Sequence, residues 1–127
     1  MDLDSLRYAK SHEWAAVADG VATVGITRFA VDQLTDVTYL ELPKVGKAVK
    51  PGDEIGVIES VKSTSAIYSP VAGEVVAVND SAVKDTGLIN EDPYEKGWFV
   101  KVRLAPGATT DHLMSKAAYD TQIADEH

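Results

Sequence analysis

The sequence contains no cysteine among its 127 residues. This absence excludes disulfides, thiolate nucleophiles, thiolate metal ligands and any thiol redox chemistry performed by the polypeptide itself. If the chain takes part in reactions of thiols or thioesters, a bound group must bring the sulfur.

Long hydrophobic runs are also lacking. The longest apolar run, Trp14–Ala18, has five residues, whereas a membrane-spanning helix needs roughly 18. The N-terminal segment MDLDSLRYAK is acidic at its start and shows no hydrophobic region of a secretory signal. We therefore expect a soluble intracellular protein without a membrane partner. Its place would be the cytoplasm of a bacterium, or the mitochondrial matrix if the chain is a processed eukaryotic one.

Basic residues are scarce relative to acidic ones. The 12 basic and 20 acidic residues give a net charge of −8, and residues 1–60 and 61–127 each hold 6 basic and 10 acidic side chains. Because no basic patch emerges, binding to nucleic acid or to an anionic membrane is disfavoured. A partner protein with a basic docking surface would suit this chain better.

The composition itself is that of an ordinary globular protein. Apolar residues make up 45% and charged residues 25% of the chain, which is enough to bury a core. The length predicts one domain over residues 1–127.

Residues 12–104 are predicted to be mostly β-strand. Two β-rich runs, 12–18 and 21–27, flank Asp19-Gly20, which is typical of a hairpin with a two-residue turn. Thr27 is expected to cap a short helix at 28–34 that buries Phe29 and Leu34. Further strands are expected at 37–42 (with residues alternating between two faces), 74–78 and 98–104, and a long surface loop at 79–97. A helical segment is expected at about 110–123. Its apolar face would be Leu113, Ala117 and Ile123, and Ser115 would split it into two short helices.

The segment from Ile55 to Tyr68 has strand propensity throughout but is too long for a single strand. Its fourteen residues would span roughly 46 Å as one strand, whereas strands usually run about 3–10 residues. We expect a break near Glu59–Ser63, its most polar part, giving a hairpin over about 55–69 with Lys62 at or beside the tip. A turn without Gly or Asn is poor turn chemistry, and such conflicts tend to mark functional sites.

No convincing catalytic or metal site is found in the sequence. Ser81 and Lys84 match an SxxK pattern without its companion motifs. Gly46-Lys47 lacks the glycine spacing and hydroxyl of a phosphate loop. Three dispersed histidines, His12, His112 and His127, do not suit a metal site. The remaining candidate is Lys62, because an exposed hairpin lysine can be acylated without clashes and the modification removes its charge.

Residues 59–63, GluSerValLysSer, followed by 67–73, IleTyrSerProValAlaGly, resemble the lipoyl-attachment hairpin of the glycine cleavage system H protein family. Biotinyl domains, by contrast, place the modified lysine between two methionines. The resemblance covers roughly residues 6–123 and includes, in the same order, SerHisGluTrp (11–14), ValGlyIleThr (24–27), LeuGluLeuPro (40–43), LeuIleAsn (88–90), AspProTyr (92–94) and GlyTrp (97–98).

The resemblance implies a mostly β fold: a flattened, barrel-like sandwich of two antiparallel sheets of the lipoyl/biotinyl-carrier type, with short helices including C-terminal ones. It implies a non-catalytic carrier with (R)-lipoate in amide linkage to Lys62. A lipoate ligase or octanoyltransferase would attach the group. The carrier would take an aminomethyl group from a pyridoxal-phosphate glycine decarboxylase to a tetrahydrofolate-dependent aminomethyltransferase, and electrons to dihydrolipoyl dehydrogenase.

Further site residues follow from the same resemblance. In the family the loaded arm folds back into a surface cleft, and Glu13 would pair there with the aminomethyl ammonium. Two positions depart from the family pattern: Ala66 stands where an acidic residue is frequent, and Thr35 where glycine is common. The cleft residues are Ser11, His12 and Glu13, and those recognised around the attachment lysine are Glu59, Ser60, Val61 and Ser63.

Three alternative functions stay open at this stage. The first is an H-like protein that mainly donates lipoyl groups for the lipoylation of other enzymes. The second is an interaction module in which Lys62 stays unmodified. The third is a small hydrolase that uses Ser81 and Lys84.

Overall fold

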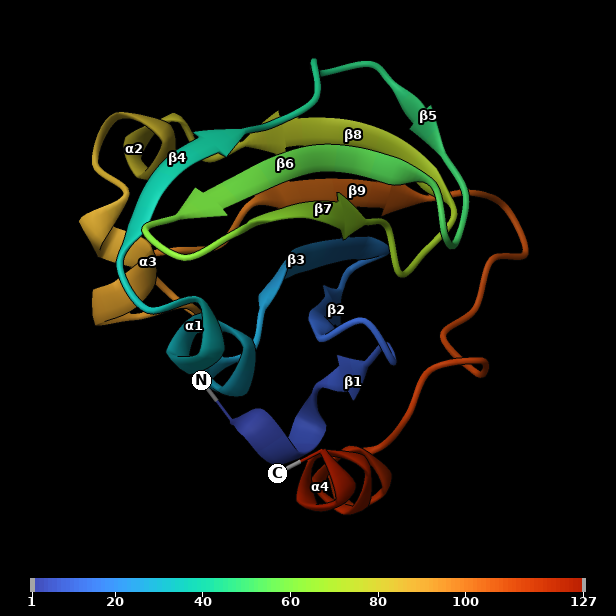
Figure 1. Ribbon diagram of the computed structural model, residues 1–127. Helices are drawn as coiled ribbons and strands as arrows, with labels where there is room; N and C mark the ends of the chain where they lie inside the picture. The colour runs from blue at the N-terminus through green and yellow to red at the C-terminus, as the bar shows by residue number, and fades with distance from the viewer. Residues whose placement is uncertain (1, 127) are drawn as a thin grey trace.

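The computed structural model describes residues 2–126, and its strands form two antiparallel sheets. The larger sheet has the strand order β1-β2-β3-β9-β8-β5, and the smaller one has the order β4-β6-β7. Figure 1 shows the smaller sheet layered against the larger one, with α4 beneath β1. The predicted class, a flattened sandwich of two antiparallel sheets with short helices, is confirmed, and the sheets do not close into a barrel.

The strands are β1 (Arg7–Tyr8), β2 (Glu13–Ala18), β3 (Val21–Ile26), β4 (Val37–Glu41), β5 (Ala48–Val49), β6 (Glu54–Ser60), β7 (Thr64–Tyr68), β8 (Gly73–Val78) and β9 (Val100–Leu104). The helices are the 3-10 helix η1 (Leu3–Ser5) and the α-helices α1 (Arg28–Leu34), α2 (Asp80–Lys84), α3 (Gly87–Glu91) and α4 (Lys116–Asp125). The last strand therefore begins at residue 100, two residues later than the sequence predicts.

The first hairpin and the helix after it follow the sequence prediction. Asp19 and Gly20 both have positive φ (53° and 77°), as a type I′ turn requires. Thr27 caps α1 by accepting a hydrogen bond from the backbone N–H of Ala30 at 3.3 Å. Leu34 is buried as predicted, whereas Phe29 is only half-buried and lies against the His12 ring, 5.2 Å between centroids.

The predicted alternation along β4 is wrong in one respect. Val37 and Leu40 are both buried, although strict alternation would put them on opposite faces. The register against β6 shifts between Val37 and Tyr39, and such a bulge turns the residues after it to the other face. Tyr39 is 44% exposed as a result.

The surface loop expected at 79–97 is wrong, because this segment contains α2 and α3. Ala82 of α2 and Ile89 of α3 are fully buried in the main core. The Asn79 side chain donates to the carbonyls of Lys96 (2.9 Å) and Trp98 (2.8 Å) and closes the segment on itself. Helices of five residues have no stability of their own, so burial against the core holds them.

The C-terminal helix is shorter than the segment expected at 110–123. It spans Lys116–Asp125, and Ser115 caps it by accepting from the Ala118 N–H at 3.3 Å, rather than splitting it. The apolar face predicted for it is also wrong, since Ala117 is exposed and Tyr119 is the buried residue. Tyr119 joins Leu6, Tyr8 and Trp14 in a small second core.

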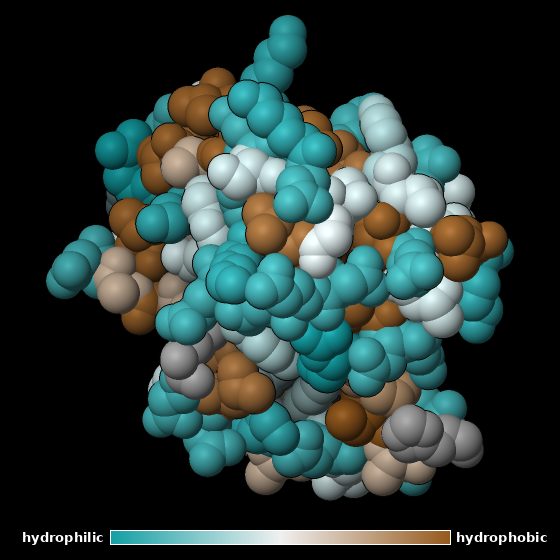
Figure 2. Space-filling model, turned by 90° about the vertical axis from the view of Figure 1, so that its left-hand side faces the viewer, coloured by the Kyte–Doolittle hydropathy of each residue, from teal (hydrophilic) through white to brown (hydrophobic). Residues whose placement is uncertain are grey.

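Figure 2 views the molecule from the side on which α1, α2 and α3 lie, and hydrophilic residues cover much of this face between separate hydrophobic patches.

Among residues 2–126, none of the helices has both the length and the apolar character that crossing a membrane requires.

Candidate functional site

The hairpin between β6 and β7 places Lys62 in its turn, as the sequence predicts. The Ser60 N–H donates to the Ser63 carbonyl at 2.8 Å. The Ser60 hydroxyl accepts from the N–H groups of both Lys62 and Ser63, each at 3.2 Å. A serine hydroxyl can close a turn in this way, and the turn needs no residue with positive φ. The Ser60 hydroxyl therefore stabilises this turn, which contains neither glycine nor asparagine.

The tip rests on the loop that follows α1 while its side chains face solvent. The Val61 N–H donates to the Asp36 carbonyl at 3.1 Å, and the Val61 side chain is 66% exposed. The Lys62 ammonium is exposed and donates to the Gln33 carbonyl at 3.5 Å, which is the outer limit of a hydrogen bond. This amine can therefore be approached and modified without breaking a strong interaction.

A second group of predicted residues lies in the turn before β2. Glu13 is only 2% exposed. One of its carboxylate oxygens accepts from the Ser11 hydroxyl, and the other accepts from the Tyr68 N–H of β7 at 3.1 Å. Burial raises the pKa of Glu13, although both hydrogen bonds oppose the shift. Glu13 thus links the two sheets through a desolvated carboxyl group.

These two groups border one cleft of about 250 Å³. Apolar side chains of Ile26, Leu34 and Ile58 form part of its walls, and Ser63 lies at the hairpin end. Ala66 also lines it, so no carboxylate stands at this position. The full lining is Ser11, His12, Glu13, Ile26, Ala30, Gln33, Leu34, Ile58, Ser63, Ser65, Ala66 and Ile67.

Of the predicted site residues, the structure brings Ser11, His12, Glu13 and Ser63 together in the lining of one cleft. Ser11, His12 and Glu13 form one wall, and Ser60, Val61, Lys62 and Ser63 form the hairpin turn. Glu59 is in β6, paired with Tyr39 and Thr64, and does not line the cleft.

Sequence reasoning missed Gln33 and Tyr119. Gln33 belongs to no recognisable motif. The Tyr119 hydroxyl lies 2.8 Å from His12, although the two residues are 107 positions apart in the sequence. No local signal in the sequence could have shown that contact.

The rejected alternatives gain no support from the geometry. Ser81 and Lys84 are both exposed on the short helix α2. Within residues 2–126 no group of three or more His, Asp or Glu residues is arranged to hold a metal ion.

Comparison with known proteins agrees with this geometry. A family model described as Glycine cleavage H-protein matches residues 6–126. The glycine cleavage system H protein of Alcanivorax borkumensis is 52% identical over 121 residues, which cover 95% of this chain and 94% of that protein. The H protein of Phenylobacterium zucineum is 49% identical over 119 residues, covering 94% and 98%.

A solved structure gives the same answer at the level of the fold. The crystal structure of a glycine cleavage system H protein from Mycobacterium marinum matches with a TM-score of 0.87 at 35% identity, and the match covers 95% of this chain and 98% of that one. On sequence and fold together, the chain belongs to the glycine cleavage H-protein family.

Proposed function

We propose that Lys62 carries lipoate in amide linkage, and that the chain serves on this tether as the carrier of the glycine cleavage system. The observation that carries the proposal is the Lys62 amine, exposed on an ordered hairpin turn beside the cleft. Membership of the family supports the carrier role. The names of the relatives do not favour the alternative role as a lipoyl donor for other enzymes.

The residues around Lys62 fit such a group. Acylation would remove a charge whose one hydrogen bond, to Gln33, is marginal, and would change the net charge from −8 to −9. The cleft offers an apolar wall to the carbon chain of the arm, including Leu34 and Ile58, and the polar Ser11–Glu13 side to its far end. Bound lipoate would supply two sulfurs capable of thiol–disulfide chemistry, whereas the cysteine-free chain has no thiol of its own.

Glu13 is proposed to receive the cationic aminomethyl cargo. Its buried carboxyl is held by Ser11 and by the Tyr68 N–H, both of which favour its ionised form. A cation brought into the cleft would lower the raised pKa of Glu13, since it offsets the desolvation that raises it. The interaction would be strong because the cleft side of this carboxyl is shielded from water. Ala66 supplies no second carboxylate, so Glu13 would act alone.

The partners and location are proposed on the same basis. Glycine decarboxylase, the aminomethyltransferase and dihydrolipoyl dehydrogenase would each receive the arm in turn, and the chain would contribute no catalytic group of its own. The attachment enzyme, a lipoate ligase or octanoyltransferase, would contact Glu59, Ser60, Val61 and Ser63 around the lysine. The relatives compared above come from bacteria, which supports a cytoplasmic location.

Intact mass after co-expression with lipoate and a lipoate ligase tests the proposal. The wild-type chain and Lys50→Arg, which changes an exposed lysine in the turn before β6, should each gain one lipoyl adduct. Lys62→Arg should gain none, and peptide mapping should place the adduct on Lys62. An adduct on another residue, or none on the folded wild-type chain, would show that Lys62 is not the attachment site.

A further inference from the structure

The C-terminal helix α4 and the residue after it contact the turn that forms one wall of the cleft. We call residues 9–12, which precede β2, the cleft turn. Three side chains of the C-terminal segment hold it: the Tyr119 hydroxyl lies 2.8 Å from His12 Nδ1, a Glu126 oxygen lies 3.3 Å from His12 Nε2, and the Gln122 amide donates to the Lys10 carbonyl at 3.0 Å. All three contacts come from the C-terminal segment, while Ser11, His12 and Glu13 line the cleft.

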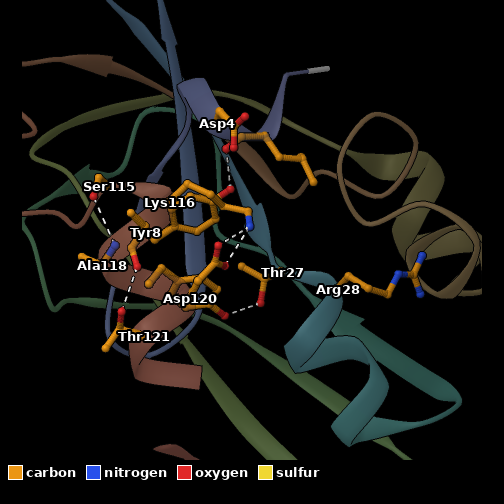
Figure 3. Close-up of polar contacts among 12 residues, drawn as sticks. Asp4, Tyr8, Thr27, Arg28, Ser115, Lys116, Ala118, Asp120 and Thr121 are labelled. Carbon is orange, nitrogen blue, oxygen red and sulfur yellow. Dashed lines mark hydrogen bonds and ion pairs between the residues drawn. The ribbon is translucent and has the colours of Figure 1, made fainter. Parts of the chain in front are cut away.

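The side chains of Glu126, His12, Tyr119 and Thr27 form one series of hydrogen bonds, and the donor of each bond can be assigned. The Glu126 carboxylate needs a donor, so a neutral His12 ring carries its proton on Nε2 and leaves Nδ1 as an acceptor. The Tyr119 hydroxyl stays protonated, because burial raises its pKa to about 12, and it donates to Nδ1. Its oxygen then accepts from the Thr27 hydroxyl at 2.7 Å. Figure 3 shows Tyr8 and Thr27 beside the ribbon of α4, with Lys116 and Asp120 of that helix next to them.

The cleft turn needs outside support because its backbone is strained. His12 has φ of 80°, a conformation that side-chain-bearing residues avoid. Its ring is packed between Phe29 and Tyr119, with centroids 5.2 and 5.7 Å away, and is 18% exposed. The backbone on either side fixes the neighbours: the Thr27 N–H donates to the His12 carbonyl at 3.0 Å, and the Ala9 N–H donates to the Glu13 carbonyl at 2.9 Å.

We propose that Tyr119 and Glu126 are positioning residues for the arm cleft: through His12 they hold the cleft turn so that Ser11 and Glu13 keep their places in its wall. This inference rests on the proposed lipoyl function, because it concerns retention of the loaded arm. The C-terminal helix thereby acts on the cargo without touching it.

The hydroxyl of Tyr119 can be separated from its packing role. Its ring stacks on Tyr8, with centroids 4.6 Å apart and planes 10° from parallel. Tyr119→Phe keeps this stacking and removes only the hydroxyl, whereas Glu126→Ala removes the acceptor that selects the His12 tautomer. Tyr39→Phe, which loses an exposed hydroxyl in β4, and Asp120→Ala, which loses a carboxylate paired with Lys116 on the same helix, are the matched controls.

The experiment uses protein lipoylated at Lys62 and loaded with a labelled aminomethyl group by the decarboxylase, then freed of partners. The rate at which the label is lost to water measures how well the cleft holds the arm. Loss of one of these hydrogen bonds should speed the loss of label about fivefold in Tyr119→Phe and Glu126→Ala. Tyr39→Phe and Asp120→Ala should lose the label at the wild-type rate. In the unmodified chain, nitrogen NMR should show the His12 proton on Nε2 at a pH where the ring is neutral.

The outcomes separate this inference from the proposed function. If mass analysis finds lipoyl on Lys62 but all four variants lose the label at the wild-type rate, the positioning role is wrong and the carrier role stands. A proton on His12 Nδ1 in the wild-type chain would also overturn it. If no lipoyl reaches Lys62, the carrier proposal itself fails. Should Tyr119→Phe fold poorly, Glu126→Ala, an exposed change at the helix end, decides the question alone.

Discussion

Thr35 occupies a backbone conformation that suits glycine. It ends α1 with φ of 63° and ψ of −137°, close to the first central position of a type II′ turn, where glycine is the preferred residue. The turn is important to the site, because Asp36 and Gln33 on either side of it contact the hairpin tip. Thr35→Gly should therefore stabilise the protein.

The expected magnitude follows from three contributions. A side-chain-bearing residue in this region costs about 1–3 kcal/mol, which glycine avoids. Glycine loses about 0.5–1 kcal/mol through the greater freedom of the unfolded chain. The Thr35 hydroxyl also gives up its hydrogen bond to the Leu34 carbonyl (2.5 Å), worth about 0.5 kcal/mol net. The midpoints of these ranges leave a gain of about 0.75 kcal/mol, or a rise in Tm of about 2–4 °C for a chain of this size.

Urea denaturation and thermal melts of the unmodified chain would measure this change. Thr64→Gly is the matched control, since Thr64 is an exposed threonine in β7 outside the positive-φ residues. This substitution should cost about 0.5–1 kcal/mol. If Thr35→Gly lowers the free energy of unfolding as much as Thr64→Gly does, the strain argument is refuted.

Three further changes test other parts of the structure. Burial raises the pKa of Glu13 above its usual 4.5, so the folded state loses stability as the pH rises and this carboxyl ionises. Glu13→Gln should therefore unfold at a higher urea concentration than the wild type near neutral pH. An equal gain in stability at acid pH, where Glu13 is protonated, would contradict this reasoning. Gly56→Ala would place its Cβ 2.3 Å from the Glu41 carbonyl oxygen and should cost about 3 kcal/mol, so an unchanged melting curve would disprove the clash. Ser60→Ala removes the hydroxyl that accepts two turn N–H groups; hydrogen exchange at Lys62 should quicken while the global stability falls by about 1 kcal/mol or less, and unchanged exchange would remove Ser60 from this role.

Local patterns predicted the elements whose signals are local. The Asp19-Gly20 hairpin, the Thr27 cap and the break near Glu59–Ser63 were all found where the sequence places them. The helices in 79–97 were missed, because their turn-rich sequence has little helical preference and the buried Ala82 and Ile89 hold them against the core.

The sequence by itself determined the chemistry available to this protein. With no cysteine and an exposed hairpin lysine as its distinctive feature, the chain can obtain reactive sulfur only by modification, and the ordered segments it shares with a family indicate which one. These conclusions depend on residue identity and on short-range spacing, both of which can be read directly along the chain.

Only the tertiary structure decided how the site is built. Glu13 and Tyr68 meet because two sheets pack face to face, and His12 meets Tyr119 because the C-terminal helix folds back onto the cleft turn. Burial and desolvation depend on these long-range contacts. The raised pKa of Glu13, the strain at Thr35 and the support of the cleft by α4 therefore appear only once the chain is folded.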